Sequence, residues 1–425
     1  PAADHALMHS VPEAVALITA AASPLPAEPT TLGDALGRVL ATDLRSPITL
    51  PHWTNSAMDG YAVRGSDVAG ASESAPVTLR VLETVAAGAF PTRAVGAGEA
   101  TRIMTGAPLP EGADTVIRVE DTDAGLGQVA VRKDRDVGKN FRLRGEDLVE
   151  GGIALPAGIP LGAAQLGILA SIGQAIVPTH RRPRVAILGS GDELVDLDRF
   201  DEVRAGRKIV SSNAYTLDAL VRLNGGIPIG LGHAADTQAA MRSLLQRAID
   251  AAPDLIVTSA GVSVGEFDHT RTALEALGAE MLVSRVRMRP GAPIGFGHVR
   301  GIPWIGLPGN PVSVMVTFEL FVRPTLRRML GHARLHRRPV RVTLEEPVRI
   351  SARLTHFLRA VVSTRPDGSL SARLTGPQGS GILTSMSLAN ALLVVPEDRG
   401  EVSAGETLHA LLLTEDAGTA EAFAL

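Results

Sequence analysis

RVAILGSGDEL, residues 184–194, is the stretch that decides the fold class of the central part of the chain. An apolar run that ends in glycines is typical of a parallel strand buried on both faces. Strand and helix patterns alternate from there onward. Further strands are expected at residues 227–231, 255–258, 281–286 and 304–307, and helices at 212–223, 238–251, 269–277 and 312–330. This alternation predicts an open α/β sheet with right-handed crossovers.

The segments before the α/β part have different sequence patterns. Residues 1–45 have helical patterns, with a second helical patch at 32–40, and the glycine-spaced apolar residues of 154–176 are suited to pack on them. Between them, from about residue 51 to 147, short alternating apolar runs are punctuated by glycine and proline, which predicts a small all-β unit. We therefore interpret this unit as an insertion into a discontinuous first domain.

Beyond residue 337 the helical patterns stop. Runs such as VRVTLEEPVRI (340–350) and ALLVVPED (391–398) indicate a C-terminal β domain. A chain of 425 residues also exceeds the roughly 250 to 300 residues at which single cores stop growing. The expected division is a helical domain (1–48 and 148–182), a β insertion (49–147), an α/β domain (183–332) and a β domain (333–425).

Composition excludes several classes of protein. Apolar residues make up 45% of the chain and charged residues 20%, which indicates a globular protein and not a disordered one. The 41 basic and 45 acidic residues are spread along the sequence, so we expect no binding to nucleic acid or to an anionic membrane. Cysteine is absent, which rules out disulfides, a thiolate metal site and a cysteine nucleophile. Any metal here needs oxygen or imidazole ligands.

The N-terminal residues lack a basic segment followed by an apolar run, and no stretch approaches the roughly 20 apolar residues of a membrane span. We therefore expect a cytoplasmic protein. Lys133, Lys139 and Lys208 are its only lysines, so arginine supplies nearly all the positive charge. An arginine in place of a lysine therefore carries little weight in this chain.

In an open α/β sheet the ligand crevice lies outside the carboxyl ends of the strands, here after residues 188, 258 and 307. The first of these loops, GSGDELV, lacks the third glycine of a dinucleotide motif and carries Asp192 and Glu193. Two carboxylates repel a phosphate unless a hard divalent cation bridges them, which favours a Mg²⁺ site. The alternative is that Asp192 merely caps a helix.

The other two loops also offer polar groups next to glycines. In the loop SAGVSVGEFDH (259–269), Gly261 and Gly265 allow the backbone to approach a ligand, and Asp268 either binds a ligand or caps the next helix. A long helix begins within GLPGNPVS (306–313), where Pro311 suits the first helical position. The N-terminus of this helix is either an anion site or the capped end of a buried helix. The polar candidates in these loops are Ser259, Ser263, Asp268, Asn310 and Ser313.

Three further motifs contain polar candidates. RMRPGAPIGFG (287–297) presents Arg287 and Arg289 beside a tight turn, and guanidinium groups suit tetrahedral oxyanions; solvated surface arginines are the alternative. In the β insertion, NSAMDGYAV (55–63) and RIMTGAPLPEGAD (102–114) indicate turns at Asp59 and Thr105.

Taken together and in this order, the motifs resemble the MoeA family, the molybdopterin molybdenumtransferases, whose eukaryotic relatives include the gephyrin E domain. The resemblance runs almost end to end. It rests on the motifs quoted above together with RGED (144–147), FLRA (357–360) and GPQGSG (376–381). It implies a discontinuous helical first domain, a β second domain, a molybdopterin-binding α/β third domain and a β-barrel-like fourth. It also implies a homodimer whose site is shared between the α/β domain of one subunit and the β domain of the other.

The family's activity implies an enzyme of molybdenum cofactor biosynthesis that inserts molybdate into adenylylated molybdopterin, with Mg²⁺-dependent release of AMP. A molybdopterin adenylyltransferase is then a possible partner. The resemblance places catalytic residues at Asp59, Thr105, Glu193 and Asp268. We expect Mg²⁺ to be held among Asp192, Glu193 and Asp268. The substrate-binding candidates are Arg142, Asp147, Ser259, Ser263, Asn310, Ser313, Arg287, Arg289, Arg359 and Ser380.

One motif departs from the family pattern. Where the family has a KPGKP turn whose two lysines hold molybdate, this chain has RPGAP, so Arg289 keeps the first charge and Ala292 removes the second. Loss of one charged hydrogen bond weakens oxyanion binding about tenfold to a hundredfold, unless Arg287 compensates. SAG and GSG also replace the more usual SGG and STG.

These departures leave two alternatives open, a tungstate-specific insertase and a non-catalytic binding or scaffold paralogue. Two other classes fit less well. A pterin adenylyltransferase would resemble the α/β domain alone, and a dinucleotide oxidoreductase would need the missing glycine at Leu194 and an acidic residue to anchor the ribose.

Overall fold

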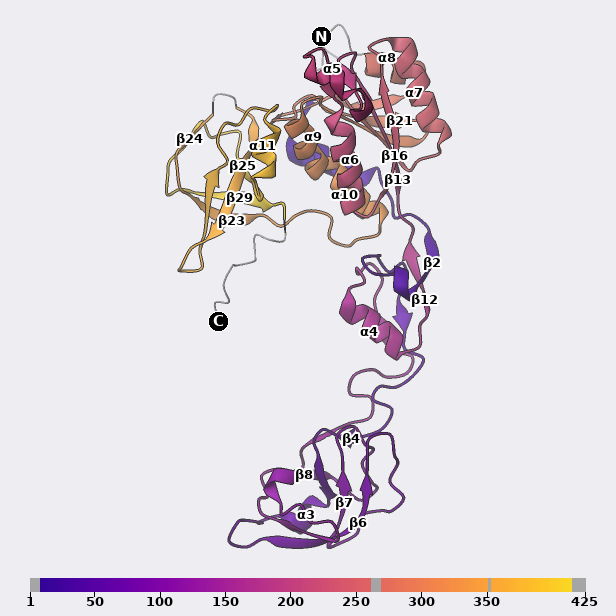
Figure 1. The fold of residues 1–425 in the computed structure, drawn as a ribbon, viewed down its shortest axis with the longest axis vertical. Helices are drawn as coiled ribbons and strands as arrows, with labels where there is room; N and C mark the ends of the chain where they lie inside the picture. Colours follow the sequence, from indigo (N-terminus) through magenta and orange to yellow (C-terminus); the bar gives the residue numbers. More distant parts are fainter. Residues whose placement is uncertain (1–7, 261–268, 351–352, 415–425) are drawn as a thin grey trace. The chain divides into compact units, whose positions relative to one another are not determined.

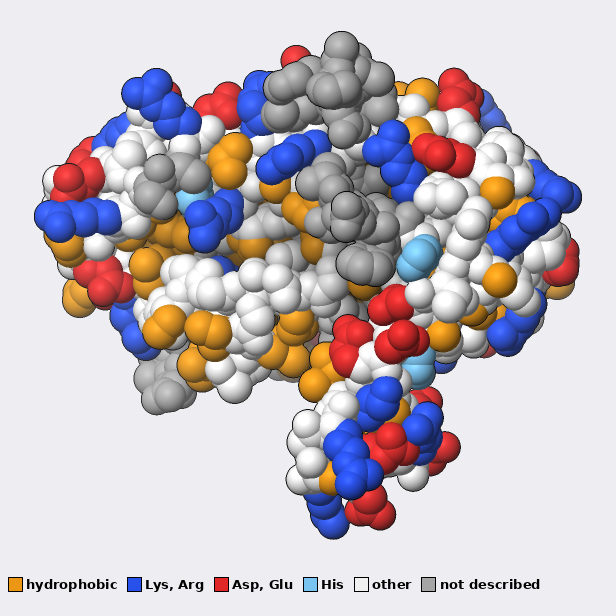
Figure 2. Space-filling view, turned by 90° about the horizontal axis from the view of Figure 1, so that it is seen from above, with side chains coloured by type: hydrophobic (Ala, Val, Ile, Leu, Met, Phe, Trp, Pro, Cys, Tyr) orange, Lys and Arg blue, Asp and Glu red, His pale blue; other side chains and the backbone are white. Residues whose placement is uncertain are grey.

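The computed structural model of the chain describes residues 8–260, 269–350 and 353–414. It divides into two compact units, which we describe separately (Figure 1). The larger unit comprises Pro1–Ala41, Gly158–Gly162 and Ile176–Leu425, and the smaller comprises Thr42–Ala157 and Ala163–Ala175. Within the described residues, no helix combines the length and apolarity that a membrane span requires. On the face drawn in Figure 2, basic and acidic side chains are interspersed.

A six-stranded sheet forms the centre of the larger unit, in the order β16-β13-β17-β22-β21-β18. Its first four strands are parallel, as the alternation of patterns predicts. Strands β21 and β18 continue the sheet with antiparallel pairings. The bounds are β13 Arg184–Ser190, β16 Ile227–Ala234, β17 Leu255–Ser259, β18 Glu280–Val283, β21 Gly295–Val299 and β22 Ile302–Leu307.

Helices cover both faces of this sheet (Figure 1). Val185 and Ile187 of β13 pack with α2, α6 and α9, whereas Ala186 and Leu188 face α7 and α8. Alternate residues of a strand point to opposite faces, so burial on both faces explains why the run RVAIL is continuously apolar. The bounds are α2 Val11–Ala20, α6 Ser212–Leu223, α7 Gln238–Asp250, α8 His269–Ala276, α9 Pro311–Thr317, the π-helical turn η4 Phe318–Val322 and α10 Arg323–Met329.

Two local predictions were wrong, and the structure excludes one alternative. The patch at 32–40, expected to be helical, contains only one 3₁₀ turn, η1 (Leu32–Asp34), and isolated bridges at Val39 and Leu40, because Gly37 takes a left-handed φ of +74° that ends a helix. The strand β2 (Ala27–Thr31) precedes it. The strand expected at 281–286 is split, and its second part β19 (Arg285–Val286) pairs with β1 (Met8–His9). The segment after β13 forms a turn and the strand β14 (Leu194–Val195), so Asp192 does not cap a helix.

The β14 strand pairs with β15 (Ile209–Val210), and the short helices η3 (Leu197–Arg199) and α5 (Phe200–Arg204) lie between them. Elsewhere in the larger unit, β2 pairs antiparallel with β12 (Ile176–His180). Helix α2 opens with a capping box in which Ser10 and Glu13 satisfy each other's backbone amides.

The C-terminal segment of the larger unit closes into a barrel. Strand β25 pairs with β26 on one side and with β27 on the other, so β25, β26, β23, β29 and β27 form a closed ring, which confirms the barrel-like domain implied by the resemblance. A short strand of the α/β segment, β20 (Met288–Arg289), joins this sheet beside β25. The bounds are β23 Val340–Leu344, β24 Val348–Arg349, β25 Thr355–Thr364, β26 Leu370–Leu374, α11 Leu383–Ser387, β27 Ala391–Val395, β28 Glu401–Val402 and β29 Thr407–Leu412.

The smaller unit is built on a five-stranded sheet in the order β8-β5-β7-β6-β9, in agreement with the predicted β texture. Tyr61, Leu79, Ile117 and Val129 form the centre of its core. The glycine-spaced apolar segment at 154–176 contains one helix, α4. The bounds are β3 Leu44–Arg45, β4 Asn55–Ser56, β5 Gly60–Val63, α3 Gly65–Val68, β6 Val77–Val85, β7 Glu99–Ile103, β8 Thr115–Arg118, η2 Val119–Asp121, β9 Gln128–Val131, β10 Phe141–Arg142, β11 Ile153–Leu155 and α4 Ala163–Ser171.

Candidate functional site

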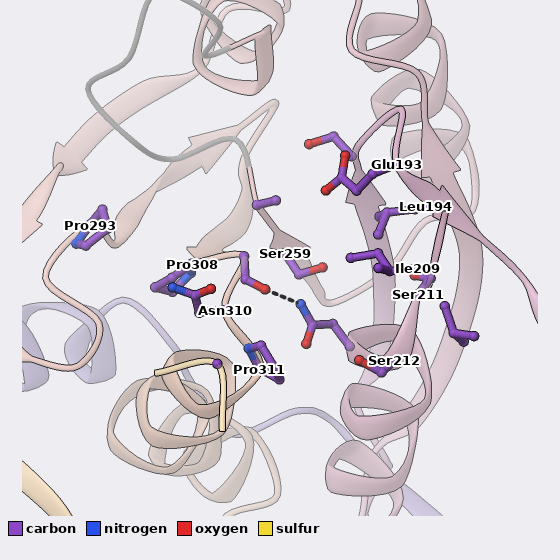
Figure 3. A pocket seen from close by; sticks show the side chains of 16 residues that line it. Glu193, Leu194, Ile209, Ser211, Ser212, Ser259, Pro293, Pro308, Asn310 and Pro311 are labelled. Carbon is purple, nitrogen blue, oxygen red and sulfur yellow. Dashed lines mark hydrogen bonds between the residues drawn. The ribbon is translucent and has the colours of Figure 1, made fainter. Parts of the chain in front are cut away.

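A pocket of about 660 Å³ opens at the carboxyl ends of β13, β17 and β22, where the α/β topology predicts the ligand edge (Figure 3). Its volume suits one small-molecule ligand. Polar and small side chains dominate the lining. The lining residues are Ser190, Glu193, Leu194, Ile209, Val210, Ser211, Ser212, Asn213, Ser259, Ala260, Pro293, Pro308, Gly309, Asn310, Pro311 and Gly381.

Two helices begin at this pocket. Helix α6 starts at Ser212, and the helical segment 311–329 starts at Pro311, the first-position proline that the sequence predicts. Neither N-cap side chain, Ser211 or Asn310, makes a capping hydrogen bond. The first backbone N–H groups of a helix lack intrahelical partners and carry the positive end of its dipole. The pocket is therefore suited to a phosphate group.

Two distant motifs meet beside the pocket. The Asn310 amide nitrogen donates to Ser380 Oγ at 2.9 Å, and the backbone N–H of Val312 donates to the Ser380 carbonyl at 3.1 Å. These bonds attach the GPQGSG loop to the start of α9, so the structure brings two predicted substrate-binding residues together. Ser313, in the first turn of α9, is buried, with 4% of its surface exposed.

The predicted Mg²⁺ ligands occupy different surroundings. Glu193 is exposed and lines the pocket. The Asp192 carboxylate instead accepts the backbone N–H of Asp236 at 3.1 Å, and its own N–H donates back to the Asp236 carboxylate at 3.2 Å. Asp268 and Ser263 lie outside the described residues. Within 8–260, 269–350 and 353–414, no three acidic or histidine side chains cluster as a metal site.

A second pocket, of about 380 Å³, lies where β20 joins the barrel, and Arg289 and Arg359 both line it. Arg359 is fully buried on β25. Its Nε donates to Ser385 Oγ at 3.0 Å and its Nη2 to the Gly379 carbonyl at 3.0 Å. Its Nη1 is buried and has no partner among the described residues. Burial lowers the pKa of this guanidinium.

Buried polar groups in native proteins are almost always hydrogen-bonded. The unpaired Nη1 of Arg359, beside a cavity that also exposes Arg289, therefore fits an oxyanion ligand. Arg287 lies elsewhere, because its Nε donates to the Glu397 carboxylate at 3.3 Å and it lines neither pocket. In this conformation Arg287 does not replace the charge lost at Ala292.

The RPGAP turn is tightly constrained. Gly291 has a φ of +101°, and a Cβ added there would lie 2.4 Å from Thr317 Cγ2. Glycine is therefore required at this position, which fixes the chain between Arg289 and Ala292.

The remaining candidates lie in the smaller unit. Asp59 accepts hydrogen bonds from the backbone N–H of Thr105 at 2.7 Å and from its hydroxyl at 2.8 Å. These two bonds lower the pKa of Asp59, because they stabilise the carboxylate. Arg142 lies opposite Asn55 in the β10–β4 pair and donates to its side-chain oxygen at 3.5 Å. Asp59, Thr105, Arg142 and Asp147 are all exposed, so each is accessible to another molecule.

Sequence reasoning missed the residues that α6 contributes. Ser211, Ser212 and Asn213 line the pocket, and Asn213 Nδ2 donates to the Gly309 carbonyl at 2.7 Å, the bond drawn in Figure 3. The available signal was the run SSN at the start of a predicted helix. Such a run usually indicates only a helix cap, so it does not by itself predict a ligand site.

Three family models match the chain. Residues 9–173 match the MoeA N-terminal region (domains I and II), residues 186–328 a probable molybdopterin binding domain, and residues 341–413 the MoeA C-terminal region (domain IV). A molybdopterin molybdenumtransferase of Nostoc sp. is 38% identical over 392 residues, which cover 89% of this chain and 87% of that protein. The Bacillus subtilis protein of the same name is 34% identical over 396 residues, covering 91% and 90%.

Solved structures agree with these matches. The crystal structure of a molybdopterin biosynthesis MoeA protein from Pyrococcus horikoshii OT3 superposes with a TM-score of 0.79 at 29% identity. The superposition covers 95% of this chain and 100% of that one. The similarity thus extends over both units and the C-terminal barrel.

Proposed function

This chain belongs to the MoeA family of molybdenum cofactor biosynthesis enzymes, and we propose that it inserts molybdate into adenylylated molybdopterin and releases AMP. The four-domain division given above is part of this proposal, and the three matched family regions are consistent with it. A cytoplasmic location and hand-over of substrate from a molybdopterin adenylyltransferase are further parts.

In this scheme the 660 Å³ pocket holds the adenylylated pterin. Its phosphates would lie against the N-terminus of α6, whose first backbone N–H groups lack intrahelical partners. At the start of α9, Pro311 has no N–H and the Val312 N–H donates to the Ser380 carbonyl, so α9 would contribute mainly through its dipole. Ser259 and Asn310 line the same pocket and offer further polar groups. The chain supplies no cysteine, and transfer to the pterin sulfurs requires no covalent protein nucleophile.

Molybdate would bind beside Arg359 and Arg289. The observation that carries this assignment is the buried, unpartnered Nη1 of Arg359 next to a cavity. The other guanidinium nitrogens donate hydrogen bonds to Ser385 Oγ and to the Gly379 carbonyl. The guanidinium is therefore already oriented before an anion binds. Preorganised donors of this kind lower the cost of binding.

In the pterin pocket, Mg²⁺ would be bound jointly by the protein and the substrate. Mg²⁺ in nucleotide sites is commonly bound by one or two carboxylates, substrate phosphates and water. Glu193 supplies one such carboxylate, and we propose Asp268 as the second, with Asp192 occupied by Asp236 in this conformation. When bound, the ion would neutralise charge on the leaving phosphate.

We propose a homodimer in which Asp59, Thr105, Arg142 and Asp147 of one subunit complete the site of the other. Their exposure in the smaller unit supports this assignment. The lowered pKa of Asp59 keeps it ionised, so it would act there as a hydrogen-bond acceptor or charge and not as an acid.

The test is AMP release from adenylylated molybdopterin, with and without Mg²⁺ and with either molybdate or tungstate. We expect release that requires both Mg²⁺ and molybdate. Release that depends on neither would refute the insertase reaction, and the absence of release would favour the scaffold alternative. A marked preference for tungstate would support the tungstate-specific alternative.

Arg289→Met tests the oxyanion site, with Arg285→Met as matched control because Arg285 is also exposed but lines neither pocket. Loss of one charged hydrogen bond should raise the molybdate concentration at half-maximal rate about tenfold or more in the first variant. The control should match the unaltered protein. Ala292→Lys should lower that concentration if the missing lysine limits binding.

A further inference from the structure

We infer that Asn213 is a substrate-positioning residue that accepts a hydrogen bond from an amino group of the substrate's heterocycle. This inference rests on the proposed function, because it assigns part of the same pocket. Asn213 stands in the first turn of α6 and lines the 660 Å³ pocket. Ser259 and Asn310, labelled in Figure 3, line the same pocket. Its two amide atoms have different surroundings.

The nitrogen of the amide has a structural task. Nδ2 donates to the Gly309 carbonyl at 2.7 Å and thereby joins α6 to the loop between β22 and α9. Gly309 is confined on its other side, because a Cβ added to it would lie 3.3 Å from the Cβ of Ala260. Asn213 therefore holds Gly309 in place against the end of β17.

The oxygen of the amide is left without a partner. Oδ1 is buried and accepts no hydrogen bond from the described parts of the chain. A rotation of the amide by 180° does not relieve this, because it would place Oδ1 2.7 Å from the Gly309 oxygen, which is also an acceptor. Unsatisfied buried polar atoms are uncommon and costly, so a ligand donor is the expected partner.

The chemistry of Oδ1 selects among the parts of the substrate. A neutral amide oxygen only accepts hydrogen bonds, so it disfavours phosphate and oxyanion groups, which are also acceptors. Adenine and pterin both carry an exocyclic amine on a flat ring, and either amine can donate to Oδ1. We therefore infer that an amino-substituted heterocycle lies next to Asn213, with the phosphates toward the backbone N–H groups.

Equilibrium binding of two probes, AMP and molybdopterin, tests the inference without requiring turnover. In Asn213→Ala the affinity for one probe should fall about tenfold, the effect of one lost neutral hydrogen bond, whereas the other should change less than twofold. The affected probe identifies the heterocycle. If AMP is affected, purine riboside 5′-monophosphate, which lacks the amine, should bind the unaltered protein about tenfold more weakly than AMP and bind the variant as AMP does.

Asn224→Ala is the matched control, because Asn224 lies at the other end of α6 and its Nδ2 also donates to a backbone carbonyl, that of Leu220. It should leave both affinities unchanged. The inference is overturned if Asn213→Ala leaves both affinities within twofold, or if it weakens both equally while lowering the melting temperature, since the residue would then act only through Gly309. Failure of AMP release with these binding results intact would count against the proposed reaction alone.

Discussion

Replacement of Ala260 by glycine should stabilise the larger unit. Ala260 follows β17, lines the main pocket and has a φ of +73°, in the left-handed region. This conformation costs an L-residue about 1 to 2 kcal/mol. Glycine avoids that strain, but it also lowers the free energy of unfolding by about 0.4 to 1 kcal/mol, because it makes the unfolded chain more flexible. The net expectation for Ala260→Gly is a gain of about 0.5 to 1 kcal/mol.

Urea unfolding followed by tryptophan fluorescence can measure this gain. Trp304 is buried in β22 and donates to Thr258 Oγ1 at 3.1 Å, so it reports on the larger unit once Trp53 has been replaced by phenylalanine. With a urea dependence of about 2 kcal/mol per molar, the midpoint should rise by about 0.25 to 0.5 M. Ala251→Gly is the control, because Ala251 at the end of α7 has an ordinary helical φ of −70° and carries no such strain.

The control should lower the midpoint, since glycine there only adds flexibility to the unfolded chain. A midpoint for Ala260→Gly that is unchanged or lower would refute the reasoning from backbone strain. Because strained residues often occur at functional sites, affinity for AMP should be measured on the same variant.

Two further predictions concern the smaller unit. Asp136 is buried and accepts two hydrogen bonds from the Arg118 guanidinium, at 2.8 and 2.9 Å, which lower its pKa. A lowered carboxyl pKa stabilises the fold above the unfolded pKa of about 4, and that stability is lost as the pH falls through the folded pKa. Asp136→Asn should therefore cost about 1 to 3 kcal/mol at pH 7 and less below pH 4, measured by urea unfolding with Trp53 fluorescence; a pH-independent difference would contradict this. Thr105→Val should raise the pKa of Asp59, because the carboxylate loses the hydroxyl donor, and an NMR titration that finds no increase would disprove that cause.

Local sequence patterns determined much of the fold. The apolar run at 184–188 specified a strand buried on both faces, and Pro311 marked the first position of a helix. The barrel was expected only through family resemblance, since the C-terminal runs by themselves indicate no more than β structure. Where local patterns misled, as at residues 32–40, helical spacing of apolar residues was outweighed by the left-handed Gly37.

The candidate site was predictable in its position but not in its contacts. Topology placed the ligand edge after β13, β17 and β22, and Glu193, Ser259 and Asn310 do line the pocket there. The direction of the Asp192 carboxylate, toward the Asp236 backbone, has no signal in the sequence around GSGDEL.

Tertiary structure alone decided which distant groups meet. Asn213 donates to Gly309, Asn310 donates to Ser380, and Arg359 is buried with no partner for its Nη1 in the described parts of the chain. The first two contacts join residues separated by 96 and 70 positions. Periodicity and capping rules describe interactions within a few residues along the chain, whereas these contacts form only when separate elements pack against each other.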